Sequence, residues 1–301
     1  MTIKNIIFIL VFTASLGFFF FNIRRIVKYL LLAQKENRFD IPIARIKNVL
    51  KIAFGQTKLL REPVAGIIHF LIFWGFMLFL LAVIESIIQG FYSPFNWGFL
   101  GSFYSIITFV QDIFGVLVLV AVIWALCRRF IQKVDRLYVG KEGNFDAAII
   151  LLLIFGVVLS MFGQNAADIA NHNFVLKENE VRPVSLAISN LFFNEPSAFT
   201  KVLFELCWWK HIVLVLGFLN FLPYSKHFHV ITSIPNVYFS KLGLEKFALK
   251  KIDLEDENVS QYGAADFEHL SWKQVLDGFT CTECGRCTSV CPAANTGKKL
   301  S

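Results

Sequence analysis

Hydrophobic residues gather in five long runs, and polar stretches separate the runs. They lie at about 3–23, 64–89, 103–127, 147–170 and 202–222. A helix needs about 20 apolar residues to cross the roughly 30 Å of bilayer hydrocarbon, and each run is long enough. The pattern therefore predicts an all-α membrane protein, with a five-transmembrane-helix bundle over residues 1–230.

The pattern becomes more polar after residue 230. Residues 231–270 have the charge density of a water-exposed linker and include the acidic patch IDLEDENVSQYG. The stretch HLSWKQVLDGFT then predicts a short amphipathic helix that leads into a cysteine-rich segment, residues 271–301. We expect both regions to lie outside the membrane.

The first run has one alternative interpretation, a cleaved signal peptide. Such a peptide carries positive charge before its apolar core and small residues after it. Here only Lys4 precedes the core, while Arg24 and Arg25 follow it, and no A-x-A site is present. The order of charges favours a membrane span.

Lysine and arginine lie unevenly between the predicted spans. Ten occur between the first and second spans and five between the third and fourth, whereas residues 90–102 contain none. Loops rich in lysine and arginine stay on the cytoplasmic side. The distribution predicts an inner membrane protein of the bacterial type, with its N-terminus outside and its C-terminus in the cytoplasm.

Composition supports the membrane interpretation and argues against nucleic-acid binding. The chain is 56% hydrophobic, contains 34 Phe and is only 17% charged, which is more apolar than a soluble domain needs. The net charge of +7 does not indicate a nucleic-acid partner, because the basic residues gather beside the apolar runs.

Four cysteines near the C-terminus have the spacing C-x-x-C-x-x-C-x-x-x-C-P. They are Cys281, Cys284, Cys287 and Cys291. This spacing is typical of bacterial ferredoxins and predicts a 4Fe-4S cluster. A zinc site more often has two separated pairs, and it remains the alternative together with a chance run. Thiolate ligands need a reducing compartment, which agrees with a cytoplasmic C-terminus.

The fourth cysteine has two interpretations. Cys291 either completes this cluster or, as in two-cluster ferredoxins, binds a second cluster whose other cysteines come from a second run. The printed sequence contains no second run. We therefore interpret residues 271–301 as a ferredoxin-type segment that is incomplete at its C-terminus, and expect a longer parent protein or a separately encoded partner.

Three histidines in or beside the second and fifth spans are candidate haem b ligands. They are His69, His211 and His229. A ligating side chain inside a span is costly, so each is a functional candidate, and histidine is the usual ligand of such haems. A purely structural role for each histidine remains the alternative.

The spacing of these histidines suggests how they could pair. His211 and His229 lie on one helix face, about 27 Å apart, if the helix continues through Pro223. His69 lies near the cytoplasmic end of its span and matches the level of His229, with His211 as its alternative partner. Gly66 and Gly75 would leave room for a flat macrocycle beside His69.

Two stretches carry a family resemblance. WWKHIVLVLGFLNFLPYSKHFHVIT resembles the last helix of the gamma subunit of respiratory nitrate reductase, a five-helix b-type cytochrome. That resemblance implies haem b at His211 and His229. The family has two further histidines on its second helix, where this chain has only His69, so one haem or two are implied. The cysteine run with AANTGKKLS resembles the ferredoxin segment of heterodisulfide-reductase-related proteins.

Together these features predict a membrane electron-transfer protein. It would carry electrons between the quinone pool, haem b and a cytoplasmic 4Fe-4S cluster, as part of a quinone-linked oxidoreductase. Family members suggest a soluble partner such as an electron-transfer flavoprotein or a thiol-disulfide reductase module. The alternative is a non-haem membrane anchor that docks a soluble iron–sulfur oxidoreductase. A transporter is disfavoured, since no broken-helix repeat is visible.

A quinone site needs a group that exchanges protons. Four candidates lie near the outer ends of the second to fourth spans: Glu85, Asp112, Asp168 and His172. Each alone is more often an ordinary interfacial side chain, so the sequence assigns no catalytic residue.

Overall fold

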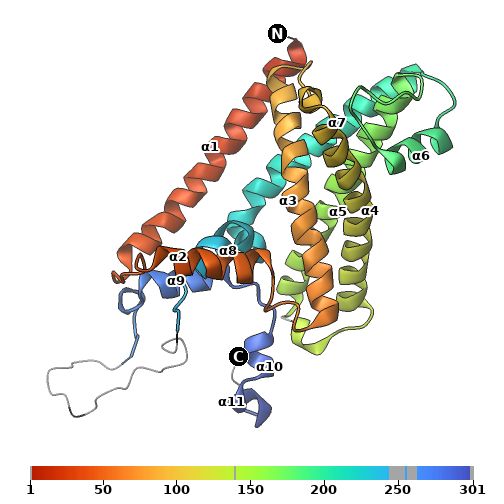
Figure 1. Cartoon of the computed structure of the whole chain (residues 1–301). Helices are drawn as coiled ribbons and strands as arrows, with labels where there is room; N and C mark the ends of the chain where they lie inside the picture. Colours follow the sequence, from red (N-terminus) through yellow and green to blue (C-terminus); the bar gives the residue numbers. More distant parts are fainter. Residues whose placement is uncertain (1, 139, 244–254, 256–262, 299–301) are drawn as a thin grey trace. The chain divides into compact units, whose positions relative to one another are not determined.

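The computed structural model describes residues 2–138, 140–243, 255 and 263–298. These residues form helices and turns without a strand ladder, apart from an isolated bridge between Gln34 and Ser271. The chain divides into two compact units (Figure 1). The first unit comprises Met1–Phe18, Glu62–Phe221 and Gly285–Ser301, and the second comprises Phe19–Arg61 and Leu222–Cys284.

Five helices are long and apolar enough to cross a membrane, as the sequence predicted. They are α1 (Ile3–Leu32), α3 (Pro63–Phe91), α4 (Ser102–Phe130), α5 (Gly140–Asn171) and α7 (Ala198–Phe221). Their most apolar windows have mean hydropathies between 1.7 and 2.7. The helices extend beyond several predicted limits, because residues such as Arg24 and Arg25 end the apolar run without ending the helix. The architecture is consistent with a multi-pass membrane protein.

The first unit is a helix bundle in which neighbouring helices approach closely. α4 packs against α3 and α5, and α5 packs against α7 (Figure 1). The core includes Val118, Val158 and Phe162. A Cβ atom at Gly75 would overlap the side chain of Val118, so this glycine lets α4 approach α3. The space beside Gly75 is therefore filled by protein, and its predicted role of leaving room for a macrocycle is wrong.

The acidic residue of the fifth span, Glu205, forms an ion pair within the first unit. The ammonium group of Lys4 on α1 lies 2.7 Å from the carboxylate of Glu205 on α7 and 4.0 Å from the ring centre of Trp208. Farther along the same two helices, the Asn220 amide donates a hydrogen bond of 2.6 Å to the Ser15 hydroxyl. Such pairing lowers the cost of polar groups in hydrocarbon.

The second unit contains α2 (Pro42–Val49), α8 (His229–Tyr238) and α9 (Trp272–Thr280). α8 packs against both of the other helices. The buried Arg45 donates hydrogen bonds of 2.9 Å to the carbonyl oxygens of Tyr238 and Ser240. α9 is the amphipathic helix that the sequence predicted, and a capping box between Ser271 and Gln274 begins it. The first part of the predicted linker is helical in α8, whereas residues 244–254 and 256–262, with most of the acidic patch, lie outside the described residues.

The fifth span does not continue through Pro223. α7 ends at Phe221, short 3-10 turns follow at Leu222–Tyr224 and Lys226–Phe228, and α8 begins at His229. Proline lacks an amide donor, and its ring clashes with the carbonyl one turn earlier, so a helix readily breaks there. The helical register that would have placed His211 and His229 on one face is therefore interrupted.

Asp112 on α4 accepts hydrogen bonds from the start of a short helix of the bundle. Its carboxylate is fully buried on α4 and faces the beginning of α6 (Pro183–Phe192). The backbone amides of Val184 and Ser185 donate to it at 2.6 and 3.1 Å, and so does the Ser185 hydroxyl. Anions are stabilised at helix N-termini by these amides and by the helix dipole. Asp112 thus has a structural role, although the sequence suggested it as a proton-exchanging group.

We predict that Asp112→Ala will destabilise the bundle. The substitution leaves three donors of α6 without an acceptor, which costs roughly 3 kcal/mol or more if each orphaned group costs about 1–3 kcal/mol. Thermal unfolding in detergent should show a lower midpoint for this variant than for Asp135→Ala, which removes an exposed carboxylate. Equal midpoints would show that the cap contributes no stability.

Candidate functional site

The four C-terminal cysteines lie in a turn-rich segment and form no disulfide with one another. Cys281 and Cys287 are exposed, whereas Cys284 and Cys291 are half-buried. The backbone is left-handed at Glu283 (φ 51°) and at Gly285 (φ 70°), with a residue of negative φ between them. Alternating backbone signs of this kind turn successive amides toward one point, as at many iron–sulfur sites.

The donor chemistry of this segment fits a 4Fe-4S cluster, because its four cysteines have the ferredoxin spacing. Within the described part of the chain, no three His, Cys, Asp or Glu side chains come close enough to hold a metal ion. The other two cysteines, Cys127 and Cys207, are half-buried on α4 and α7. Cluster ligation by the C-terminal run stays a prediction.

The first half of the cysteine run is tied to the turn before His229 within the second unit. The Lys226 ammonium group lies 2.9 Å from the carboxylate of Glu283, which stands between Cys281 and Cys284. The rings of Phe228 and Phe279 also meet edge to face, with centroids 6.4 Å apart. Residues beside His229 therefore contact residues beside the first two cysteines.

The second half of the run is tied to the start of α3 within the first unit. Arg286 Nε lies 2.7 Å from one carboxylate oxygen of Glu62, and the other oxygen pairs with Arg136. The hydrogen bond from Arg286 lowers the pKa of Glu62, and the nearby arginine charges act in the same direction. A Cβ atom at Gly285 would overlap the Arg136 carbonyl, so only glycine allows this contact.

His229 has features of a haem ligand. Its Nδ1 atom lies 3.1 Å from the carbonyl oxygen of Lys226. A carbonyl on Nδ1 fixes the tautomer in which Nε2 is basic, as in most metal-bound histidines. Burial also lowers the pKa of His229, which favours the neutral imidazole that metals bind.

His211 is held in a similar way, but His69 is not near it. The Nδ1 atom of His211 lies 3.1 Å from Ser160 Oγ and 3.3 Å from the carbonyl oxygen of Val157 on α5. His211 lines a cavity to which α3 contributes Ala82 and residues that follow it. His69 precedes Ala82 on α3 by 13 residues (82 − 69), roughly 20 Å of helix. The structure therefore does not bring His69 and His211 together, and the pairing of His69 with His229 stays a prediction.

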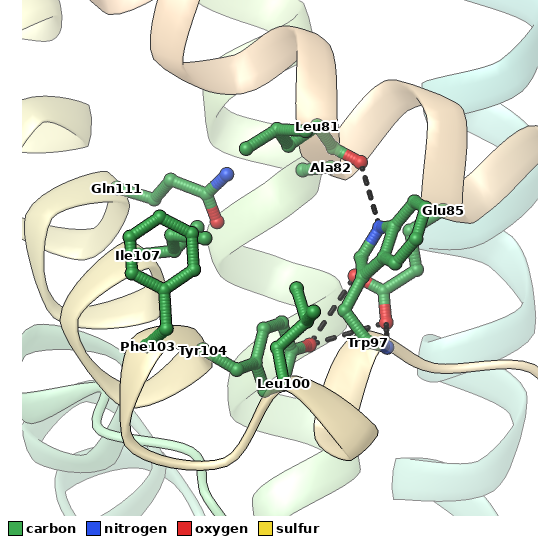
Figure 2. Close-up of a pocket in the computed structure, with 9 residues that line it drawn as sticks. All are labelled: Leu81, Ala82, Glu85, Trp97, Leu100, Phe103, Tyr104, Ile107 and Gln111. Atoms are coloured by element: carbon green, nitrogen blue, oxygen red, sulfur yellow. Dashed lines mark hydrogen bonds between the residues drawn. The ribbon is translucent and has the colours of Figure 1, made fainter.

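A mostly apolar pocket of about 90 Å³ lies beside Glu85 (Figure 2). The Tyr104 hydroxyl lies 3.1 and 3.2 Å from the two carboxylate oxygens of Glu85, and the Trp97 amide lies 3.4 Å from one of them. The lining comes from α3, from the 3-10 turn Trp97–Leu100 and from α4: Leu81, Ala82, Glu85, Trp97, Leu100, Phe103, Tyr104, Ile107 and Gln111.

A second cavity, of about 70 Å³ and with a polar lining, shares Ala82, Glu85 and Tyr104 with that pocket. Glu180 lies 3.4 Å from the Tyr104 hydroxyl and 3.5 Å from Arg182. Burial lowers the pKa of Arg182, but the negative charge of Glu180 and other neighbours raises it further, so the guanidinium stays charged. The cavity thus holds a buried cation between carboxylates.

Of the remaining sequence candidates, Asp168 lines this cavity and His172 contacts Asp168. Asp168 pairs with Lys177 at 2.7 Å, while His172 is half exposed and bonds to the Asp168 carbonyl at 2.8 Å. Sequence analysis missed Tyr104, Glu180 and Arg182. For Glu180 and Arg182 the sequence offered one signal, because these two opposite charges come shortly before Pro183 at the start of an apolar helix.

Two curated proteins resemble most of the chain. It is 37% identical over 301 residues to "Probable iron-sulfur-binding oxidoreductase FadF" of Bacillus subtilis (strain 168), covering 99% of this chain and 41% of that protein. It is 30% identical over 294 residues to "EtfAB:quinone oxidoreductase" of Syntrophomonas wolfei subsp. wolfei (strain DSM 2245B / Goettingen), covering 94% and 40%. The chain is related to iron–sulfur oxidoreductases.

The chain spans about two fifths of the length of these relatives. No family model and no solved structure matches it. Both relatives are named as oxidoreductases, and the Bacillus subtilis protein is also named as iron–sulfur-binding.

We predict that the cysteine run binds iron. Replacing Cys281, Cys284 or Cys287 by serine should remove most of the iron and labile sulfide of the anaerobically purified protein, because each loses one thiolate of the cluster. Cys127→Ser and Cys207→Ser should keep both, since these thiols lie in apolar helices. Unchanged iron in all three variants of the run would contradict cluster ligation.

We predict that acid will release the contact between Glu62 and Arg286. The folded pKa of Glu62 is lowered, so its stabilising contribution is present above the ordinary glutamate pKa of about 4.3 and is lost as pH falls through the lowered value. Hydrogen exchange at residues 286–289, corrected for intrinsic rates, should be faster in Glu62→Gln than in the unmodified protein at pH 7, and the difference should vanish in acid. Equal exchange in the two proteins at pH 7 would argue against this ion pair.

Proposed function

We propose that the protein transfers electrons between the quinone pool, haem b and a cytoplasmic 4Fe-4S cluster. Its N-terminus would lie outside and its C-terminus in the cytoplasm of a bacterial-type inner membrane. Five apolar helices, the lysine and arginine distribution and the cysteine run support this arrangement. The chain would act within a larger quinone-linked oxidoreductase.

The contact of Lys226 with both candidate sites carries the proposal. Its carbonyl oxygen lies 3.1 Å from His229 Nδ1, and its ammonium group lies 2.9 Å from Glu283, beside Cys284. One residue thus connects a candidate haem ligand with the candidate cluster segment inside the second unit. A membrane carrier that hands electrons to a soluble protein needs such proximity between its two cofactors.

Haem b would supply one-electron chemistry inside the helix bundle. His229 and His211 fit its ligation, because His211 is buried, His229 is half-buried, and each has Nδ1 beside a backbone carbonyl. His69 is the further candidate from the resemblance to nitrate reductase gamma subunits. One haem or two can be built from these three histidines.

The name of one relative suggests the partners that we propose. The name of the Syntrophomonas wolfei protein couples EtfAB to quinone. By analogy, the soluble partner here is an electron-transfer flavoprotein or a thiol-disulfide reductase module, and the membrane substrate is quinone or quinol. If the histidines were structural, the chain would instead be a non-haem anchor for an iron–sulfur oxidoreductase.

We predict that His229→Ala will lose b-type haem while His227→Ala retains it. The two rings lie only 4.9 Å apart, so the control changes the same residue type at nearly the same place. The dithionite-reduced absorption spectrum of purified protein should lose a b-type alpha band in the first variant only. A spectrum without any haem band in the unmodified protein would establish the anchor alternative.

A further inference from the structure

We propose that the apolar pocket beside Glu85 binds the headgroup of a quinone, and that Glu85 exchanges the proton of that headgroup with the polar cavity behind it. The inference rests on the proposed function and assigns to it a binding site and a proton-exchanging residue. The pocket and the cavity lie entirely within the first unit.

Exposed apolar side chains border the pocket, and we interpret this border as facing hydrocarbon. Phe103, Leu81 and Leu100 form its rim and are 61%, 40% and 38% exposed on helices and turns of the apolar bundle. A volume of about 90 Å³ is smaller than the roughly 150 Å³ cavity that encloses a benzene. The pocket therefore receives the oxygen-bearing edge of a ring, while the rest of the ring and its apolar tail lie along Phe103.

Glu85 is the polar group that such an edge would meet. It is a carboxylate nine-tenths buried in an apolar span, which is costly and marks a functional residue unless it is fully paired. Its partners are the Tyr104 hydroxyl and the Trp97 amide. Tyr104 also reaches Glu180 at 3.4 Å, and its one proton can serve only one of the two carboxylates at a time. When this hydroxyl donates to Glu180, the Glu85 carboxylate keeps only the Trp97 amide as a donor and is open to accept a proton.

The cavity provides the route by which that proton leaves. Glu85 and Tyr104 line both the pocket and the cavity. Asp168 and Lys177 also line the cavity, and their side chains are 19% and 41% exposed. The Asn165 amide nitrogen lines the cavity, buried and without a hydrogen-bond partner among the described residues. Buried polar groups of this kind are usually satisfied by water, and 70 Å³ is ample for it.

The proton step balances with a one-electron acceptor. When a quinol is oxidised, one O–H bond would break, the proton would move to a Glu85 oxygen, and the electron would pass to the ferric haem b of the proposed function. Glu85 would release this proton to the polar cavity before it accepts the second one, and the second electron would leave by the same acceptor, which yields the quinone. In the direction of quinone reduction the same groups return the two protons.

Several charged or titratable groups from three parts of the chain line the cavity beside Glu85. The loop before α6 contributes Lys177, Glu180 and Arg182, α5 contributes Asp168, and α7 contributes His211. Glu180 lies 3.5 Å from Arg182, so one guanidinium and the carboxylates of Glu85, Glu180 and Asp168 border the space in which the proton would be exchanged.

The test is a set of variants in the full chain, purified in detergent. In Glu85→Gln the rate of haem reduction by decylubiquinol should fall about 100-fold or more, the range for loss of a proton-transfer group, with decylubiquinone binding changed less than threefold. Glu195→Gln, an exposed glutamate outside both cavities, should behave like the unmodified protein. Equal rates in these two variants would overturn the role of Glu85.

A second variant tests the pocket without touching a charge. Ala82→Leu should weaken the quenching of tryptophan fluorescence by decylubiquinone at least tenfold, and Trp97→Phe should remove most of the quenching. Binding as tight in Ala82→Leu as in the unmodified protein would overturn the site. The quenching needs no haem, so failure of the pocket is distinguishable from failure of the proposed function, which would appear as a missing haem band.

Discussion

A charged group inside an apolar bundle must find its partner within the protein, and this constraint shapes the described structure. Hydrocarbon offers no water to solvate a carboxylate, so each acidic side chain in a span either pairs or changes its protonation. Glu205 pairs with Lys4, and Asp112 accepts the amides of α6. Both contacts join separate helices, so the need to satisfy charge also fixes how the helices pack.

Glu85 satisfies the same constraint less completely. Its main partners are a neutral hydroxyl and one distant amide rather than a cation or several helix amides. We propose proton exchange for a carboxylate held in this way, whereas the carboxylate of Asp112 has a structural role. Three acidic residues that look alike in the sequence thus have different chemistry, because their partners come from distant parts of the chain.

The sequence predicted those features that depend on local pattern. Five apolar helices and the amphipathic helix α9 follow from composition and periodicity over neighbouring residues. The break at Pro223 could have been expected from its missing amide, but the spacing of His211 and His229 favoured a continuous helix. The filled space beside Gly75 could not be read from the sequence, because it depends on Val118 of another helix. Tyr104 and Arg182 were missed for the same reason.

The exposed rim at Phe103 has a consequence for how the pocket would be supplied. A ligand that enters past this side chain arrives from the lipid phase, where it diffuses in two dimensions. Its occupancy then depends on the number of ligand molecules per lipid and not on the amount added per volume of buffer. Diluting the bilayer with extra phospholipid would lower saturation even when the total quantity of ligand is unchanged.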